Sequence, residues 1–250
     1  MRNHLKNYTA SSIMVLALLV LWEAGSQWYN KSFVWPAPTE ILLKLWELRE
    51  ILILVHLPAT FLIIAVGLGI SIFLGVGLAI WMNRSKAVEK AIYPLLIASQ
   101  TIPIIALAPI FILWFGYSIW SKVVVTVLIT FFPITVSTFD GLCSANKELR
   151  ELLLTMGASK KDVFYKLSVP STLPYFFSGL KVAVTLSVIG AAIGEWLGAQ
   201  AGLGYFSRRM MTQFDGPAVF APIVLLSLVG IVLFVLVTMI EKNRLKWRKS

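Results

Sequence analysis

A single lysine, Lys181, lies inside a long apolar stretch of the sequence, ten residues past Ser171. If that stretch crosses a membrane, a charged side chain near its middle is costly and is a candidate for function by default. Lys181 could balance the charge of an anionic solute, or it could pair with an acid such as Asp140. Alternatively, its long side chain could reach the interface and keep the ammonium in water. The sequence leaves these interpretations open.

A second group of polar residues interrupts the apolar run between Ala91 and Gly116, and its members are Ser99, Gln100, Thr101 and Pro103. At about 1.5 Å per residue this run is one membrane span with an overhang, not two spans. A broken helix with polar side chains is tolerated in lipid only where protein or water covers it. These residues are therefore candidates for a translocation pathway. Hydrogen bonding between helices of a packed bundle is the alternative.

Residues typical of catalysis or metal binding are sparse. The two histidines, His4 and His56, are too far apart in the sequence to indicate a metal site, and the single Cys143 excludes an internal disulfide. No paired carboxylates and no serine beside a histidine indicate an enzyme. The glycine-rich segment around Gly202 and Gly204 has neither the spacing nor the preceding strand of a phosphate-binding loop. We therefore expect no catalytic or metal site in this chain.

The composition defines the class of protein. Of the 250 residues, 58% are hydrophobic and 14% are charged, with a mean hydropathy of +0.82. A soluble domain carries about 25% charged residues, so the sequence predicts an all-α, polytopic membrane protein. The net charge of +10 could suggest nucleic acid, but the basic residues lie in short loops between apolar spans, which membrane topology explains better. We expect lipid contacts and no nucleic-acid partner.

Hydropathy divides the chain into six predicted spans within one transmembrane domain, residues 1–250. The spans cover about residues 12–30, 57–82, 91–108, 122–142, 171–194 and 217–240, and a polar loop covers residues 146–170. The first apolar segment also resembles the core of a signal peptide. We interpret it as a retained helix, because uncharged residues continue from Ala24 to Asn30 and lengthen it enough to span.

The distribution of Lys and Arg predicts the orientation. With both termini inside, 15 of the 22 Lys and Arg residues lie on the inner side, six lie outside and Lys181 lies in the membrane. Inner loops carry the excess of positive charge in membrane proteins. The sequence therefore predicts an N-in, C-in arrangement with residues 146–170 in the cytoplasm.

The stretch from Glu151 to Pro170 predicts two short helices joined by a turn. Leucines and a methionine before the turn recur at helical spacing and give the first helix an apolar face, formed by Leu149, Leu152, Leu153 and Met156. Gly157 is suited to a left-handed turn at the end of that helix. Ser159, followed by Asp162 three residues later, resembles a capping box that begins the second helix. We expect this second helix to end before Pro170.

The same stretch resembles the loop motif of ABC importer permeases. That motif runs Glu-Ala-Ala, three residues, Gly, nine residues, Ile, one residue, Leu-Pro. Glu151, Gly157, Leu167, Val169 and Pro170 match its spacing, with Leu152 and Leu153 in place of the alanines. The segments WPAPTEI and GEWLGAQAGLGYF resemble the nitrate, sulfonate, taurine and thiamine-pyrimidine branch of this family. The resemblance covers nearly the whole chain.

The resemblance implies a type I importer permease fold and a set of partners: two cytoplasmic ATPase subunits, a second permease copy, and an extracytoplasmic substrate-binding protein. Transferred by motif position, the contacts to the ATPase would be Glu151, Gly157, Ala158, Ser159, Lys160 and Lys161. This chain has no Walker sequence, so ATP and Mg would be bound by the partner and no cofactor by this chain. Charged residues at an outer rim steer docking, which makes Glu195, Arg208 and Arg209 candidates for contact with the binding protein.

The resemblance therefore predicts the permease subunit of an ATP-driven importer in a bacterial inner membrane. Its solute would be a small polar nutrient. The outer segment favours a thiamine-precursor pyrimidine, with sulfonate, taurine or nitrate as the alternatives. A secondary carrier using Lys181 and Asp140 as a charge relay is less well supported, because such carriers usually show an internal repeat and none is evident. An intramembrane enzyme would need a catalytic cluster that the sequence does not offer.

Overall fold

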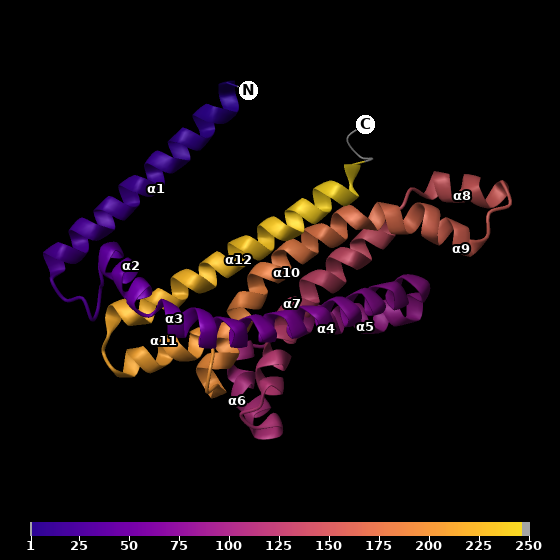
Figure 1. The fold of residues 1–250 in the computed structure, drawn as a ribbon. Coiled ribbons are helices and arrows are strands. Elements are labelled where there is room, and N and C mark those ends of the chain that lie inside the picture. Colours follow the sequence, from indigo (N-terminus) through magenta and orange to yellow (C-terminus); the bar gives the residue numbers. More distant parts are fainter. Residues whose placement is uncertain (1, 247–250) are drawn as a thin grey trace.

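The structure is a computed structural model that describes residues 2–246, with side chains from residue 12 onward. The described residues form helices joined by short loops (Figure 1). The helices are α1 (Arg2–Tyr29), α2 (Pro38–Glu47), α3 (Arg49–Ile51), α4 (Leu57–Arg84), α5 (Lys86–Ser99), α6 (Ile104–Phe115), α7 (Ile119–Cys143), α8 (Lys147–Thr155), α9 (Lys160–Val163), α10 (Val169–Gly198), α11 (Leu203–Thr212) and α12 (Gly216–Arg244). Two π-helical turns, η1 (Leu52–His56) and η2 (Phe164–Ser168), lead directly into α4 and α10. Residues 247–250, the end of the basic tail, lie outside the described residues.

Four helical segments in the described part of the chain are long and apolar enough to cross a membrane. They are Arg49–Arg84, Ile119–Cys143, Lys160–Gly198 and Gly216–Arg244. Helices α5 and α6 could form a fifth span, but they are bent by 99° at the break between them. This break coincides with Gln100–Pro103, the polar interruption identified in the sequence. The architecture is thus an all-helical membrane protein with four or five spans by this criterion.

Helix α7 lies between α4 and α10, and glycines allow all three helices to approach closely. A Cβ atom at Gly67 of α4 would lie 2.7 Å from Thr126 Cγ2 of α7. On the other side of α7, a Cβ atom at Gly190 of α10 would lie 2.9 Å from Thr126 Cα. Thr126 is therefore held between two glycines from different helices. Small residues allow this kind of close packing in lipid, where the hydrophobic effect does not drive helices together.

The buried threonines of α7 satisfy their hydroxyl groups within the bundle. Thr126 donates to the Lys122 carbonyl at 3.0 Å, and Thr130 donates to the Thr126 carbonyl at 2.8 Å. Ser71 of α4 and Thr130 share a further hydrogen bond of 2.6 Å between the two helices. Because water cannot reach these groups, the bonds remove the cost of burying hydroxyls.

Helix α1 stands apart from the bundle, and its apolar residues Ile13–Leu21 are exposed (Figure 1). Among its residues with described side chains, those near its C-terminal end hold it to the following segment: Trp22 Nε1 donates to the Pro36 carbonyl at 3.0 Å and Ser26 Oγ donates to the Trp35 carbonyl at 2.6 Å. In α2, which follows α1, Lys44 forms ion pairs with Glu47 at 3.3 Å and with Asp215 at 3.4 Å. The hydrogen bond to Glu47, helped by Asp215, raises the pKa of Lys44 above its ordinary value. The pair with Asp215 ties α2 to the start of α12.

Candidate functional site

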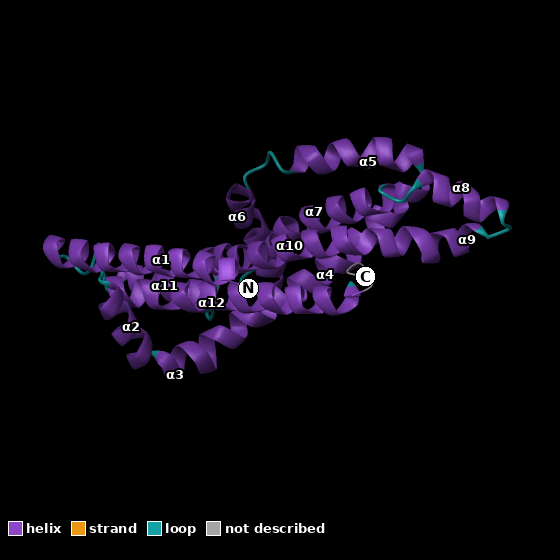
Figure 2. Ribbon diagram, turned by 90° about the horizontal axis from the view of Figure 1, so that it is seen from above, coloured by secondary structure: helices purple, strands orange, loops and turns teal. Residues whose placement is uncertain are grey.

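Helices α8 and α9 form a polar hairpin that projects beyond one end of the bundle (Figures 1 and 2). The side chain of Asn146 caps α8, accepting from the Leu149 N–H at 3.1 Å. Four apolar side chains of α8 and its end remain exposed: Leu149 (47%), Leu152 (54%), Leu154 (42%) and Met156 (75%). An apolar face on a hairpin that leaves the bundle is typical of a surface that binds another protein.

The turn between α8 and α9 has the geometry that the sequence indicated. Gly157 adopts a φ of +85°, in the left-handed region that glycine enters at little cost. The N–H groups of Gly157 and Ala158 donate back to the carbonyls of Leu154 at 3.0 Å and Leu153 at 2.9 Å, which closes the end of α8. The turn is therefore fixed by local hydrogen bonds.

The second helix of the hairpin begins with the predicted capping box. Ser159 Oγ accepts from the Asp162 N–H at 3.2 Å, and the Asp162 carboxylate accepts from the Ser159 N–H at 3.2 Å. Lys166 pairs with Asp162 at 3.1 Å. The remaining predicted ATPase contacts, Glu151, Lys160 and Lys161, are exposed on the hairpin. All six residues that the motif selected thus lie on one projecting element.

The expectation that this helix ends before Pro170 was wrong. The chain passes from α9 through the π-helical turn η2 into α10, and Lys160–Gly198 forms a helical segment of 39 residues. Pro170 lies in the first turn of α10, where the widened hydrogen bonding of the π-turn requires no N–H from it. A continuous helix therefore connects the hairpin to the bundle.

Lys181 is paired, but not with the acid that the sequence suggested. Its ammonium lies 2.9 Å from the carboxylate of Glu241 on α12, and the two side chains are 25% and 19% exposed. Asp140 is exposed at the end of α7. The suggested pair with Asp140 is thus corrected to Glu241, 60 residues further along the chain. The charge of Lys181 is thus balanced by a carboxylate of the protein itself.

The other pathway candidates lie at the break between α5 and α6. Ser99 donates to the Leu96 carbonyl and Thr101 to the Ala98 carbonyl, each at 2.7 Å, while Gln100 is exposed and Pro103 precedes the first turn of α6. No hydrogen bond or ion pair within residues 12–246 joins these residues to Lys181. The structure therefore does not bring the two groups of candidates into one site.

Glu195 is fully buried near the C-terminal end of α10, with 0% of its surface exposed. One of its oxygens, Oε2, accepts from the Gly204 N–H at the start of α11 at 2.7 Å. The other oxygen, Oε1, has no hydrogen-bond partner in the described structure. Glu195 was expected to contact a binding protein, but burial removes it from any docking surface. The carboxyl group instead satisfies a backbone N–H at the start of α11.

Two side chains near the start of α4 complete this buried polar cluster. His56 Nδ1 accepts from the Gly202 N–H at 3.1 Å, and Thr60 Oγ1 accepts from the Leu203 N–H at 2.8 Å. Gly202 has a φ of +123°, and a Cβ atom there would overlap the Glu195 carboxyl group. Sequence reasoning missed this cluster. An acid at the end of an apolar span, followed by a glycine-rich segment, was the only local sign of it.

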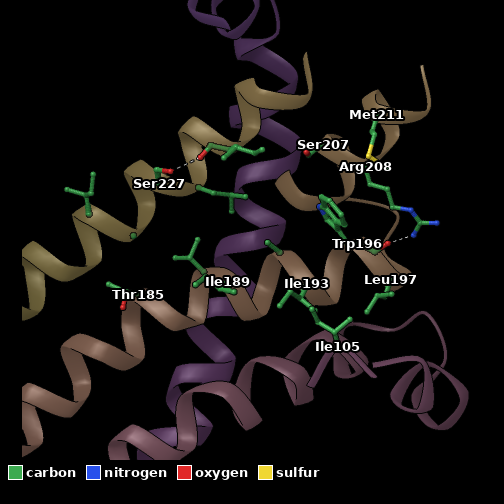
Figure 3. A pocket seen from close by; sticks show the side chains of 16 residues that line it. Ile105, Thr185, Ile189, Ile193, Trp196, Leu197, Ser207, Arg208, Met211 and Ser227 are labelled. Atoms are coloured by element: carbon green, nitrogen blue, oxygen red, sulfur yellow. Dashed lines mark hydrogen bonds between the residues drawn. The ribbon is translucent and has the colours of Figure 1, made fainter. Parts of the chain in front are cut away.

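Arg208 and Arg209 follow in α11 and are both exposed. An Nη1–H of Arg208 donates to the Trp196 carbonyl at the end of α10, as Figure 3 shows. The docking candidates therefore separate into two kinds. The two arginines are exposed on α11, whereas Glu195 is buried and accepts a hydrogen bond from the start of that helix.

Together the fold and the projecting hairpin define a polytopic helical membrane protein with a polar element outside the membrane. Residues 67–246, which include this hairpin, match the family model described as the binding-protein-dependent transport system inner membrane component. The chain belongs to that family.

Three curated relatives extend the match to the N-terminal region. The formylaminopyrimidine transport permease protein of Halalkalibacterium halodurans is 58% identical over 239 residues, covering 96% of each chain. The riboflavin transport system permease protein of Chloroflexus aurantiacus is 32% identical, covering 95% of this chain and 90% of the relative. A putative aliphatic sulfonates transport permease protein of Bacillus subtilis is 29% identical, covering 95% and 87%.

The family assignment confirms the predicted class. The chain is a transport permease subunit of an ABC importer in the inner membrane, and it is not an enzyme. Membership of a binding-protein-dependent system implies an ATPase and a substrate-binding protein as partners.

Proposed function

We propose that this permease imports a thiamine-precursor pyrimidine of the formylaminopyrimidine type. The observation that carries the proposal is the 58% identity, across nearly the full length, to a formylaminopyrimidine permease. Relatives named for riboflavin and for aliphatic sulfonates are 32% and 29% identical, so sulfonate, taurine or nitrate is the weaker alternative. The ion pair between Lys181 and Glu241 also favours an uncharged solute, because it removes the one predicted intramembrane cation.

The proposal includes a topology of six spans with both termini inside. Helix α1 would supply the first span and the bent pair α5 and α6 the third. The excess of Lys and Arg in the loops assigned to the inner side supports this orientation. The C-terminal end of α12 and the α8–α9 hairpin lie toward the same end of the bundle in Figure 1, which agrees with it.

Transport would be driven through the α8–α9 hairpin. Two ATPase subunits, which would bind ATP and Mg, would each receive one hairpin from a permease homodimer. The exposed leucines of α8 would anchor in the ATPase, with Glu151, Lys160 and Lys161 beside them. Because η2 and α10 continue the hairpin without a break, movement of the ATPases would reach the bundle through a continuous helix.

Uptake in proteoliposomes tests the proposed substrate. The permease is co-reconstituted with its ATPase and its binding protein, and accumulation of labelled formylaminopyrimidine is measured with and without internal ATP. We expect ATP-dependent uptake that excess unlabelled taurine or nitrate does not inhibit. Uptake of a sulfonate, with none of the pyrimidine, would contradict the proposal.

A further inference from the structure

An apolar groove of about 860 Å³ runs along α10, between α11 and α12 and beside the start of α6. Figure 3 shows side chains from these helices facing one another across it. Its walls are mainly aliphatic, and they include Ile105, Ile189, Ile193, Met211, Ile223 and Ile231. The groove extends along α10 from Thr185 to Leu197, a rise of about 18 Å at about 1.5 Å per residue. It is therefore large enough to hold a small organic solute.

The hydroxyl groups in the groove already donate hydrogen bonds to backbone carbonyls. Thr185 donates to the Val182 carbonyl at 2.8 Å and Ser227 to the Ile223 carbonyl at 3.0 Å. Ser207 donates to the Val219 carbonyl at 3.1 Å. These hydroxyl oxygens can still accept hydrogen bonds from a solute, but they have no hydrogen left to donate. An anion, which needs donors, would find none among them.

Among the described residues that line the groove, Arg208 is the one that is charged, and it lies on α11. Its guanidinium is exposed and already donates to the Trp196 carbonyl. A sulfonate or nitrate moving past Arg208 would lose its water to an apolar wall without a compensating cation. Such transfer of an unpaired charge is strongly unfavourable. Past Arg208, the walls of the groove therefore offer an anion no compensating charge.

Within the described part of the chain, Trp196 is the aromatic residue that lines the groove, and it is 43% exposed. Aromatic rings stack on indole in offset or edge-to-face arrangements and gain energy beyond simple burial. The free N–H groups of Arg208 next to it could donate to a ring nitrogen or an amide oxygen. An aromatic surface beside a donor matches a flat heterocycle.

We propose that this groove is a contact site on the transport route for an uncharged, flat heteroaromatic solute, with Trp196 as its stacking surface. The inference rests on the proposed function and narrows it, because it locates the selection of neutral over anionic solutes in the permease as well as in the binding protein.

The stacking role is tested by substituting Trp196 in the complete transporter of permease, ATPase and binding protein. Trp196→Leu keeps an apolar side chain and removes the ring, while Trp196→Phe keeps an aromatic face. We expect the KM for formylaminopyrimidine uptake to rise about twofold to tenfold in the leucine variant and to stay near wild type in the phenylalanine variant. Co-purification of the ATPase checks assembly. Equal KM values in all three proteins would overturn the stacking role.

The groove itself is tested by filling it. A Cβ atom at Gly230 would have Val188 Cγ2 as its nearest neighbour, 3.6 Å away, so Gly230→Trp places an indole in the groove. Gly69 of α4 has no atom within 4 Å of such a Cβ atom and does not line the groove, so Gly69→Trp is the matched control. We expect Gly230→Trp to reduce uptake at least tenfold in an assembled transporter, while the control transports normally.

Two results would overturn this assignment. Normal uptake by Gly230→Trp would show that the solute does not pass through the groove. Failure of Gly230→Trp to assemble, with normal assembly of the control, would identify the groove as an interface between subunits. Both results differ from failure of the proposed function, in which the wild-type transporter itself takes up no pyrimidine.

Discussion

Lys181 of α10 and Glu241 of α12 form an ion pair of 2.9 Å that joins two membrane-spanning helices. Removal of one partner leaves a partly buried charge unpaired, whereas removal of both leaves apolar surface. Breaking a fully buried pair costs about 3–5 kcal/mol, and the partial exposure of both side chains reduces this to about 1–3 kcal/mol.

We therefore expect Lys181→Met to lower the melting temperature of the purified permease and Lys181→Met/Glu241→Leu to recover most of it. Thermal unfolding in detergent measures both effects. If the double variant is stable yet no longer transports, Lys181 contacts the solute and the structural interpretation of the pair is wrong.

Gly157 provides a test of coupling through the α8–α9 turn. A side chain there meets no neighbour within 4 Å, so Gly157→Trp costs only the strain of a φ of +85°, about 1–2 kcal/mol. We expect this variant to insert normally but to lose ATP-driven uptake, because the indole prevents the hairpin from seating in the ATPase.

Gly116→Trp is a suitable control for coupling, because Gly116 also has a positive φ, +63°, and open space around it. It lies between α6 and α7, away from the hairpin. ATPase activity and uptake should remain linked in this control. Normal uptake by Gly157→Trp would count against a coupling role for the turn.

Gly67 and Gly69 are neighbours on α4 with opposite surroundings, and this contrast tests the packing of α4 on α7. A Cβ atom at Gly67 would lie 2.7 Å from Thr126 Cγ2. A Cβ atom at Gly69 would have no neighbouring atom within 4 Å. We expect Gly67→Val to destabilise the bundle by about 1–3 kcal/mol through overpacking and Gly69→Val to have little effect. Equal melting temperatures for the two variants would argue against close packing at Gly67.

Gly202 and Glu195 test the buried polar cluster at the start of α11. Any side chain at Gly202 would overlap the Glu195 carboxyl group, and the φ of +123° adds backbone strain. We expect Gly202→Ala to cost at least about 2 kcal/mol of stability. Glu195→Gln keeps an oxygen that can accept from the Gly204 N–H, so its cost should stay below about 1 kcal/mol. Thermal unfolding measures the stability of both variants. A larger loss of stability in Glu195→Gln than in Gly202→Ala would contradict this description of the cluster.

The α8–α9 hairpin shows how far local sequence carries the prediction. Gly157, Ser159 and Asp162 determine the turn and the cap through hydrogen bonds between residues at most a few positions apart, and these were predicted. The prediction at Pro170 was wrong because a π-helical turn before it keeps the helix continuous, and no local residue pattern indicated that turn. A single proline signal does not distinguish a helix end from the first turn of a new helix.

The class of protein, its apolar segments and the hairpin were predicted from local patterns, because hydropathy, charge distribution and turn chemistry act over short stretches of chain. The partners of the isolated polar groups became visible in the folded structure. Glu241 reaches Lys181 from 60 residues away, and the start of α4 meets the loop after Glu195 across more than 140 residues. Such pairings depend on how helices pack in three dimensions, and no local pattern encodes them.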